Sequence, residues 1–162
     1  MLTQHPKLIA LAPMLRYTDR HFRYLLRLIA PKTVLYTEMY TTDALIRGKA
    51  HELLAYHPAE HPVAVQVAGH NPHDLQSCAR IGAAIGYDEI NFNVACPSNR
   101  VKSGNMGACL MLVPDQVAEC VAAMQAAVKV PVTVKCRLGV DDHDSYACLY
   151  KFVTTVAVAG CK

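Results

Sequence analysis

Short runs of apolar and β-branched residues alternate along the chain with longer segments in which apolar residues recur every three or four positions. No hairpin signal joins the short runs, so the pattern predicts parallel strands connected by crossover helices. The expected strands are 8–12, 34–39, 63–68, 89–94 and 132–137. The expected helices are 18–29, 42–47, one opening at Pro72, one opening at Pro114, and one capped by Ser145 that reaches about Ala159.

Five strand–helix units are compatible with two architectures, a doubly wound open sheet and part of a (β/α)8 barrel. A strand covered by helices on both faces of an open sheet is apolar throughout. Three strands of this chain instead carry polar residues at alternate positions: Gln66; Asn91 and Asn93; Thr133, Lys135 and Arg137. Because such side chains can point into a barrel and meet a ligand near the carboxyl ends of the strands, the pattern favours the barrel.

Length limits how much of a barrel the chain can form. A complete (β/α)8 barrel has about 250 residues and often at least 200, whereas this chain has 162 and reaches Gly160 where a sixth strand should begin. The expected fold is therefore α/β, of the (β/α)8 TIM-barrel type, truncated after about five βα units, with residues 1–162 as one incomplete barrel. Its first and fifth strands would be open edges, which favour aggregation or pairing with another chain.

The first helix carries two distinct sets of residues. Its expected core-facing apolar set is Phe22, Leu25, Leu26 and Ile29. A stripe of arginines recurs at intervals of four, three and four residues: Arg16, Arg20, Arg23 and Arg27. Charged helix faces are usually solvated, so we expect these arginines on the outer surface, with contact to a polyanion such as RNA as the alternative.

Composition excludes several classes of protein. The chain is 52% apolar, which is too much for a disordered protein, yet it has no run of about 18 apolar residues to cross a bilayer and no secretory signal pattern. Its seven cysteines include no C-x-x-C pair, and its histidines lack a ligand spacing. We therefore expect a cytoplasmic protein with neither disulfides nor a metal site.

The most unusual segment is 91–111, in which Cys96 ends a strand and is followed by Pro97 and Ser98. Such a cysteine can lie at the mouth of a site, where Arg100 and Lys102 add positive charge. Gly104 and Gly107 allow the loop to approach a ligand or to adopt positive φ. The ordinary alternative is that Cys96 is a small buried residue, as many free cysteines are.

Segment 91–111 resembles the signature of the tRNA-dihydrouridine synthases, with closest agreement to the bacterial A-type members. Five further stretches agree in order and spacing: 12–15 with 18–20; 35–39; 61–66; 86–91; and 131–135 with 141–142 and 144–146. The similarity covers nearly the whole chain. It implies a flavin enzyme in which NADPH reduces FMN and the reduced flavin then saturates the C5=C6 bond of uridines in the D-loop of tRNA.

The resemblance also implies roles for individual residues. Cys96 falls on the proton donor to C5, a suitable acid because ordinary cysteine thiols are mostly protonated at neutral pH. The remaining expected roles are flavin hydrogen bonding by Gln66, stabilisation of the reduced flavin by Lys135, contact with the isoalloxazine by Pro13, Met14 and Leu15, and contact with the target nucleotide by Asn93. Two of these roles have ordinary structural alternatives. Met14 would be a core residue, and Lys135 would be a charged side chain that snorkels to solvent at a strand end. We expect Gln66 and Lys135 to be buried without protein partners.

Other family elements would lie beyond Lys162, namely a His-Ala-Arg stretch, the loops that hold the FMN phosphate, and a C-terminal helical domain that binds tRNA. We therefore expect the chain alone to bind FMN poorly, and we leave its own activity open. Two alternative functions remain. One is a barrel lyase that forms a Schiff base through Lys135; the other is a non-catalytic remnant, or a partner that is completed by a separate C-terminal half.

Overall fold

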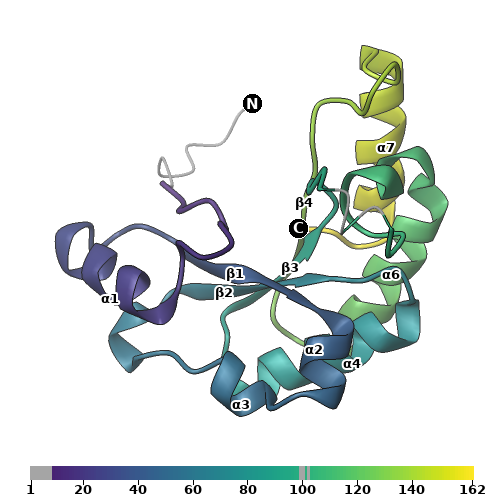
Figure 1. The fold of residues 1–162 in the computed structure, drawn as a ribbon. Coiled ribbons are helices and arrows are strands. Elements are labelled where there is room, and N and C mark those ends of the chain that lie inside the picture. The colour runs from purple at the N-terminus through teal and green to yellow at the C-terminus, as the bar shows by residue number, and fades with distance from the viewer. Residues whose placement is uncertain (1–8, 99–100, 102) are drawn as a thin grey trace.

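The computed structural model describes residues 9–98, 101 and 103–162, and it contains a parallel sheet of four strands (Figure 1). The strands are β1 (Leu35–Thr41), β2 (Val63–Ala68), β3 (Glu89–Asn93) and β4 (Val132–Lys135). They lie in the order β1-β2-β3-β4, so each strand pairs with the next one along the chain. Beside β1, Ala10 adds one parallel bridge to Val34.

The helices begin where the sequence offers caps. Asp19, Asn71 and Ser145 each accept backbone N–H bonds as N-caps, and Pro72 and Pro114 each occupy a first helical turn. The helices are α1 (Arg20–Ile29), α2 (Thr42–Arg47), α3 (Ala50–Leu53), α4 (Pro72–Ile85), α6 (Pro114–Ala127) and α7 (Tyr146–Val158), with 3₁₀ helices η1 (Pro58–Glu60) and η2 (Gly107–Leu112). The expected helices are thus confirmed, with small changes at their ends.

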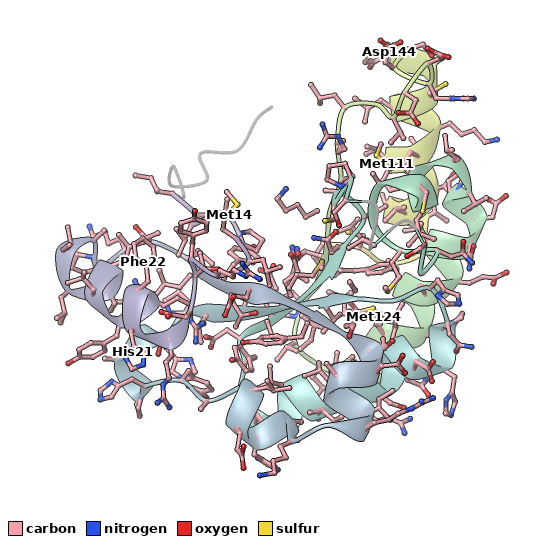
Figure 2. All side chains as sticks on the ribbon, in the orientation of Figure 1. Met14, His21, Phe22, Met111, Met124 and Asp144 are labelled. Carbon is pink, nitrogen blue, oxygen red and sulfur yellow. The ribbon has the colours of Figure 1, made fainter. Side chains whose placement is uncertain are left out.

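One face of the sheet is covered by helices that pack against one another in chain order, α2 on α4, α4 on α6 and α6 on α7 (Figure 1). The approach of α4 is close, because a Cβ on Gly82 would lie 2.8 Å from Ile90 Cδ1 and 2.9 Å from Val65 Cγ1. Met124 of α6 is buried in this layer, whereas Met14 is exposed above the sheet (Figure 2). Sequential strand order with a single helical layer is typical of a (β/α)8 barrel, so a doubly wound sheet is wrong for the described residues.

Strand boundaries differ from the expected ones mainly at the sheet ends. Strand 63–68 is confirmed, 89–94 and 132–137 end earlier, and 34–39 becomes 35–41 with a register shift between Tyr36 and Met39. The expected strand 8–12 is reduced to pairing of Ile9 and Leu11 with Val34, and Leu8 lies outside the described residues. Pro13 follows at once and has no N–H with which to extend this ladder.

Helix α1 faces the protein with its arginines rather than with its apolar residues. Arg23 is 1% exposed and Arg27 is also buried, while Phe22 and Ile29 are exposed. Of the expected apolar set, Leu26 alone packs against the core. The expectation of a solvated stripe holds for Arg16 and Arg20, which are exposed, and is wrong for Arg23 and Arg27.

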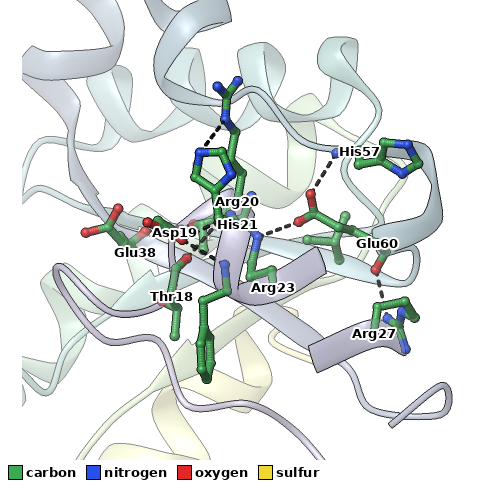
Figure 3. Close-up of polar contacts among 12 residues, drawn as sticks. Thr18, Asp19, Arg20, His21, Arg23, Arg27, Glu38, His57 and Glu60 are labelled. Atoms are coloured by element: carbon green, nitrogen blue, oxygen red, sulfur yellow. Dashed lines mark hydrogen bonds and ion pairs between the residues drawn. The ribbon is translucent and has the colours of Figure 1, made fainter. Parts of the chain in front are cut away.

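Arg23 and Arg27 of α1 are buried because they bond to the segment that precedes β2. Glu60 is fully buried there, and its Oε2 is 2.6 Å from Arg23 Nε while its Oε1 accepts the backbone N–H of His57 (Figure 3). Arg27 Nη2 donates to the carbonyls of Glu60 and Pro62 at 2.8 and 3.1 Å. A buried carboxylate and buried carbonyls require hydrogen-bond donors, which no apolar helix face supplies.

The Arg23–Glu60 pair should contribute strongly to stability. We expect Arg23→Met to lower the free energy of unfolding by about 3–5 kcal/mol, because Glu60 would remain buried without its cation. The matched control is Arg47→Met, which breaks an exposed helical ion pair with Asp43 and should cost less than about 1 kcal/mol. Urea unfolding followed by circular dichroism measures both. Equal losses in the two variants would contradict the assigned role of the buried pair.

Candidate functional site

The sheet face opposite the helices carries a continuous set of polar side chains. Gln66 is in register with Asn91, Asn91 with Thr133, and Asn93 with Lys135. Register partners on parallel strands point to the same side, as do residues two apart on one strand. Gln66, Asn91, Asn93, Thr133 and Lys135 therefore share one face, on which β3 separates the strand of Gln66 from that of Lys135.

Both polar atoms of the Gln66 side chain are hydrogen-bonded to neighbours on β3. Its Nε2 donates to Asn91 Oδ1 at 2.7 Å, and its Oε1 accepts from Asn93 Nδ2 at 2.8 Å. The expectation that Gln66 and Lys135 are buried without partners is therefore wrong. Gln66 is 1% exposed but paired, because carboxamides at matching heights on adjacent strands complement each other, and Lys135 is exposed at the end of β4.

The polar face continues toward the amino ends of the strands through residues that the sequence analysis did not select. Asn91 Nδ2 donates to Thr133 Oγ1 at 2.8 Å, and the Thr133 hydroxyl donates to Glu89 Oε1. The Tyr36 hydroxyl donates to the same Glu89 oxygen at 2.7 Å. Burial, reinforced by the Glu89 contact, raises the pKa of Tyr36 well above its ordinary value, so Tyr36 stays a donor. In the sequence, Glu89 alternates with Asn91 and Asn93, and this pattern could have predicted that Glu89 lies on the same sheet face as the two asparagines.

Cys96 follows β3 at the carboxyl edge of the sheet and is half-buried. Its backbone N–H donates to Asn93 Oδ1 at 3.0 Å, and its carbonyl accepts from the Ala108 N–H at 3.0 Å. Its Sγ is 3.6 Å from Ser98 Oγ. Cys78 and Cys120 are instead buried, and burial raises the pKa of each of these two thiols to about 12.

The Pro13–Leu15 turn lies next to β1 and is not hydrogen-bonded to Gln66, Asn93 or Cys96 within the described residues. The Met14 carbonyl accepts the Thr18 N–H at 3.0 Å, and the backbone N–H of Arg16, at φ 68°, donates to Glu38 of β1. Met14 and Leu15 are 53% and 59% exposed. Met14 is therefore not a core residue in this structure, and both side chains are accessible to a ligand.

Arg137 places a second cation near Cys96. Its Nη1 is 3.5 Å from the carbonyl of Ala95, and its backbone N–H faces the sulfur of Met111. Arg137 lies two positions after Lys135, in the same series of alternate polar residues. This alternation is the sequence pattern that indicates Arg137 as a site residue. The other expected cations near Cys96, Arg100 and Lys102, lie outside the described residues.

Together these groups offer carboxamide edges, two cations and a thiol at the carboxyl ends of parallel strands, which defines a site of the (β/α)8-barrel type. Residues 10–162 match the family model described as dihydrouridine synthase (Dus), so the chain belongs to the dihydrouridine synthase family. The fold and family expected from the sequence are thus confirmed.

Similar proteins with curated names agree with this family. The chain is 57% identical over 156 residues to a tRNA-dihydrouridine(20/20a) synthase of Vibrio cholerae, which covers 96% of the chain and 47% of the relative. It is 57% identical over 154 residues to the protein of the same name from Synechocystis sp., with 95% and 46% covered. The chain therefore spans about half the length of these relatives.

Two physical properties of the described residues bear on the remaining expectations. No helix in the described part of the chain combines the length and apolar character needed to cross a membrane. Residues 9–98, 101 and 103–162 contain no group of three or more His, Cys, Asp or Glu side chains arranged to hold a metal ion.

The loop that returns to Cys96 depends on Gly107. Its φ is +73°, and a Cβ there would lie 2.4 Å from the Cys96 carbonyl oxygen. We expect Gly107→Ala to lower the free energy of unfolding by more than about 1 kcal/mol and to expose the Ala108 amide to hydrogen exchange.

Gly104→Ala in the same loop is the matched control for Gly107→Ala. A Cβ at this position would first meet the terminal methyl of Met106, a flexible group that can move. We therefore expect wild-type protection of the Ala108 amide in Gly104→Ala. Chemical denaturation and amide exchange measure both variants, and unchanged protection in Gly107→Ala would refute the close contact.

Proposed function

We propose that this chain forms the flavin-binding part of a tRNA-dihydrouridine synthase, which reduces the C5=C6 bond of uridine in the D-loop of tRNA with FMN and NADPH. The observation that carries the proposal is the hydrogen-bonded connection of Gln66, Asn93 and Cys96 on the sheet face that also carries Lys135. Family membership and the names of the relatives support the same reaction.

The residues present are suited to a flavin ring. After its two hydrogen bonds, the Gln66 amide retains one N–H and one acceptor lone pair. Because Gln66 is 1% exposed, the edge of a heterocycle would reach these groups only after neighbouring side chains move. The exposed Lys135 would place an ammonium group beside the ring, where it stabilises the negative charge gained on reduction. Pro13 and the exposed side chains of Met14 and Leu15 would contact the isoalloxazine.

Cys96 is the proposed proton donor. When bound, the flavin that NADPH has reduced supplies a hydride for C6 of the uracil. Cys96 gives its thiol proton to C5, so the hydride and the proton together saturate the double bond. Asn93 holds the Cys96 backbone and retains one N–H, through which it can contact the target nucleotide.

In this proposal residues 1–162 provide strands one to five of an FMN-binding barrel. The remaining strands and a helical tRNA-binding domain would then lie in the part of the relatives that this chain does not match. A function on tRNA with NADPH implies a cytoplasmic protein. A half-barrel partner and a non-catalytic remnant are the competing outcomes, because both would present the same fold without independent turnover.

The test joins this chain to the segment of the Vibrio cholerae relative that follows the matched region. We expect FMN absorbance near 450 nm and NADPH-dependent dihydrouridine formation on unmodified tRNA. Cys96→Ala should keep the flavin absorbance and slow dihydrouridine formation by at least about 100-fold, the usual loss on removing a general acid. Cys148→Ala, at an exposed cysteine of α7, is the matched control and should have wild-type activity.

Other results would overturn parts of the proposal. Unchanged turnover in Cys96→Ala would remove Cys96 from the mechanism. Borohydride trapping of a carbonyl substrate on Lys135, in a protein without flavin absorbance, would favour the Schiff-base lyase. The chain alone is assayed in parallel, and tight FMN binding by it would contradict the expectation of weak binding.

A further inference from the structure

A single chain of hydrogen bonds connects the amino-end interior of the sheet to the cysteine loop. It starts on β3, crosses to β4, returns through β3 to β2 and ends just after β3; from Thr133 onward its donor–acceptor distances lie between 2.7 and 3.2 Å. In order, it passes from Glu89 to Thr133, Asn91, Gln66 and Asn93, and it ends at the backbone N–H groups of Ala95 and Cys96. The three carboxamide side chains in it are all buried.

The cysteine end allows only one direction for this chain. Backbone N–H groups only donate, so the atom of Asn93 that faces Ala95 and Cys96 must be its oxygen. The Nδ2 of Asn93 therefore faces Gln66 and donates to it, so the accepting atom of Gln66 must be Oε1. The same reasoning directs Gln66 Nε2 to Asn91 Oδ1, and it leaves the Asn91 amide nitrogen to donate to Thr133.

The opposite end agrees with this direction. Glu89 Oε1 accepts a hydrogen bond from both the Thr133 hydroxyl and the Tyr36 hydroxyl. Thr133, having donated its proton to Glu89, offers oxygen lone pairs to Asn91. Donors and acceptors therefore match at every step from Glu89 to Cys96.

We infer that Asn93 is a positioning residue, which holds the Cys96 backbone and sets the orientation of the Gln66 amide, and that Glu89 anchors this orientation from the interior. A flipped Gln66 amide would oppose NH₂ to the NH₂ of Asn93 and oxygen to the oxygen of Asn91. The remaining N–H and lone pair of the Gln66 amide thus have fixed places. The catalytic consequence rests on the proposed function; the hydrogen-bond direction does not.

Asn93→Asp provides a sharp test because it keeps the acceptor for the Cys96 and Ala95 N–H groups and removes the donor to Gln66. The new carboxylate would repel Gln66 Oε1, so the Gln66 amide should flip and donate to it. Asn91 would then flip in turn, and the Thr133 hydroxyl would leave Glu89 for Asn91. The substitution is expected to reverse the bonds that join Thr133, Asn91, Gln66 and position 93 and to break the Thr133–Glu89 bond, while it leaves Cys96 held.

The measurement is ¹⁵N NMR of the 162-residue chain without flavin or tRNA. In the wild type we expect one slowly exchanging side-chain amide proton each on Gln66, Asn91 and Asn93. In Asn93→Asp the Gln66 and Asn91 side-chain resonances should shift, although the Asn91 side chain bonds to Gln66 and Thr133 rather than to position 93. The Cys96 and Ala95 backbone amides should stay protected. In Asn93→Leu those two amides should exchange about tenfold faster, which corresponds to one lost hydrogen bond.

The matched control is Asn71→Asp, which keeps the capping acceptor for the His73 and Asp74 N–H groups at the exposed start of α4. It should leave the Gln66 and Asn91 resonances in place. The inference is overturned if the wild-type side-chain amides exchange as fast as that of Asn71, or if Asn93→Asp leaves Asn91 unshifted. Should Asn93→Leu not fold, the wild type and Asn93→Asp decide the question. Failure of the dihydrouridine assay alone would leave these NMR results unchanged, so the two failures are distinguishable.

Discussion

The parallel register of four strands in sequential order is the constraint on which the rest of this structure depends. It sends alternate residues of β2, β3 and β4 to opposite faces, so the apolar positions meet α4 and α6 while the polar positions meet one another. A slip of one residue in any strand would exchange the two faces. The carboxamides of Gln66, Asn91 and Asn93 would then be buried against the helices, where donors and acceptors could not be matched.

A buried polar anchor holds the other end of the molecule. Arg23 and Arg27 of α1 bind Glu60 and the carbonyls that precede β2, across 37 and 33 residues of sequence. This arrangement turns Phe22 and Ile29 outward and gives α1 an exposed apolar surface. Periodicity correctly predicted the helix but not which side faces inward, because its buried partners are distant in sequence and one of them is charged.

Site residues fall into two groups according to how they were found. Resemblance to a family selected Cys96, Gln66, Lys135 and Asn93, and the fold places them at one edge and face of the sheet. Tyr36 and Glu89 were not selected, and Arg137 was noted only as part of an alternating polar pattern, because alternation by itself does not show which polar residues bond to one another. Their importance follows from contacts with residues that lie 26 to 53 positions away in the sequence.

The sequence alone determined the number and type of most elements, the barrel-type class and the prominence of Cys96, because alternation, caps and prolines act over a few residues. Tertiary structure decided which residues are partnered: that Gln66 is buried and satisfied, that Lys135 is exposed, and that two arginines of α1 are interior. Hydrogen-bond satisfaction in a buried site depends on groups from separate strands at matching heights. Only the register of the assembled sheet specifies those heights.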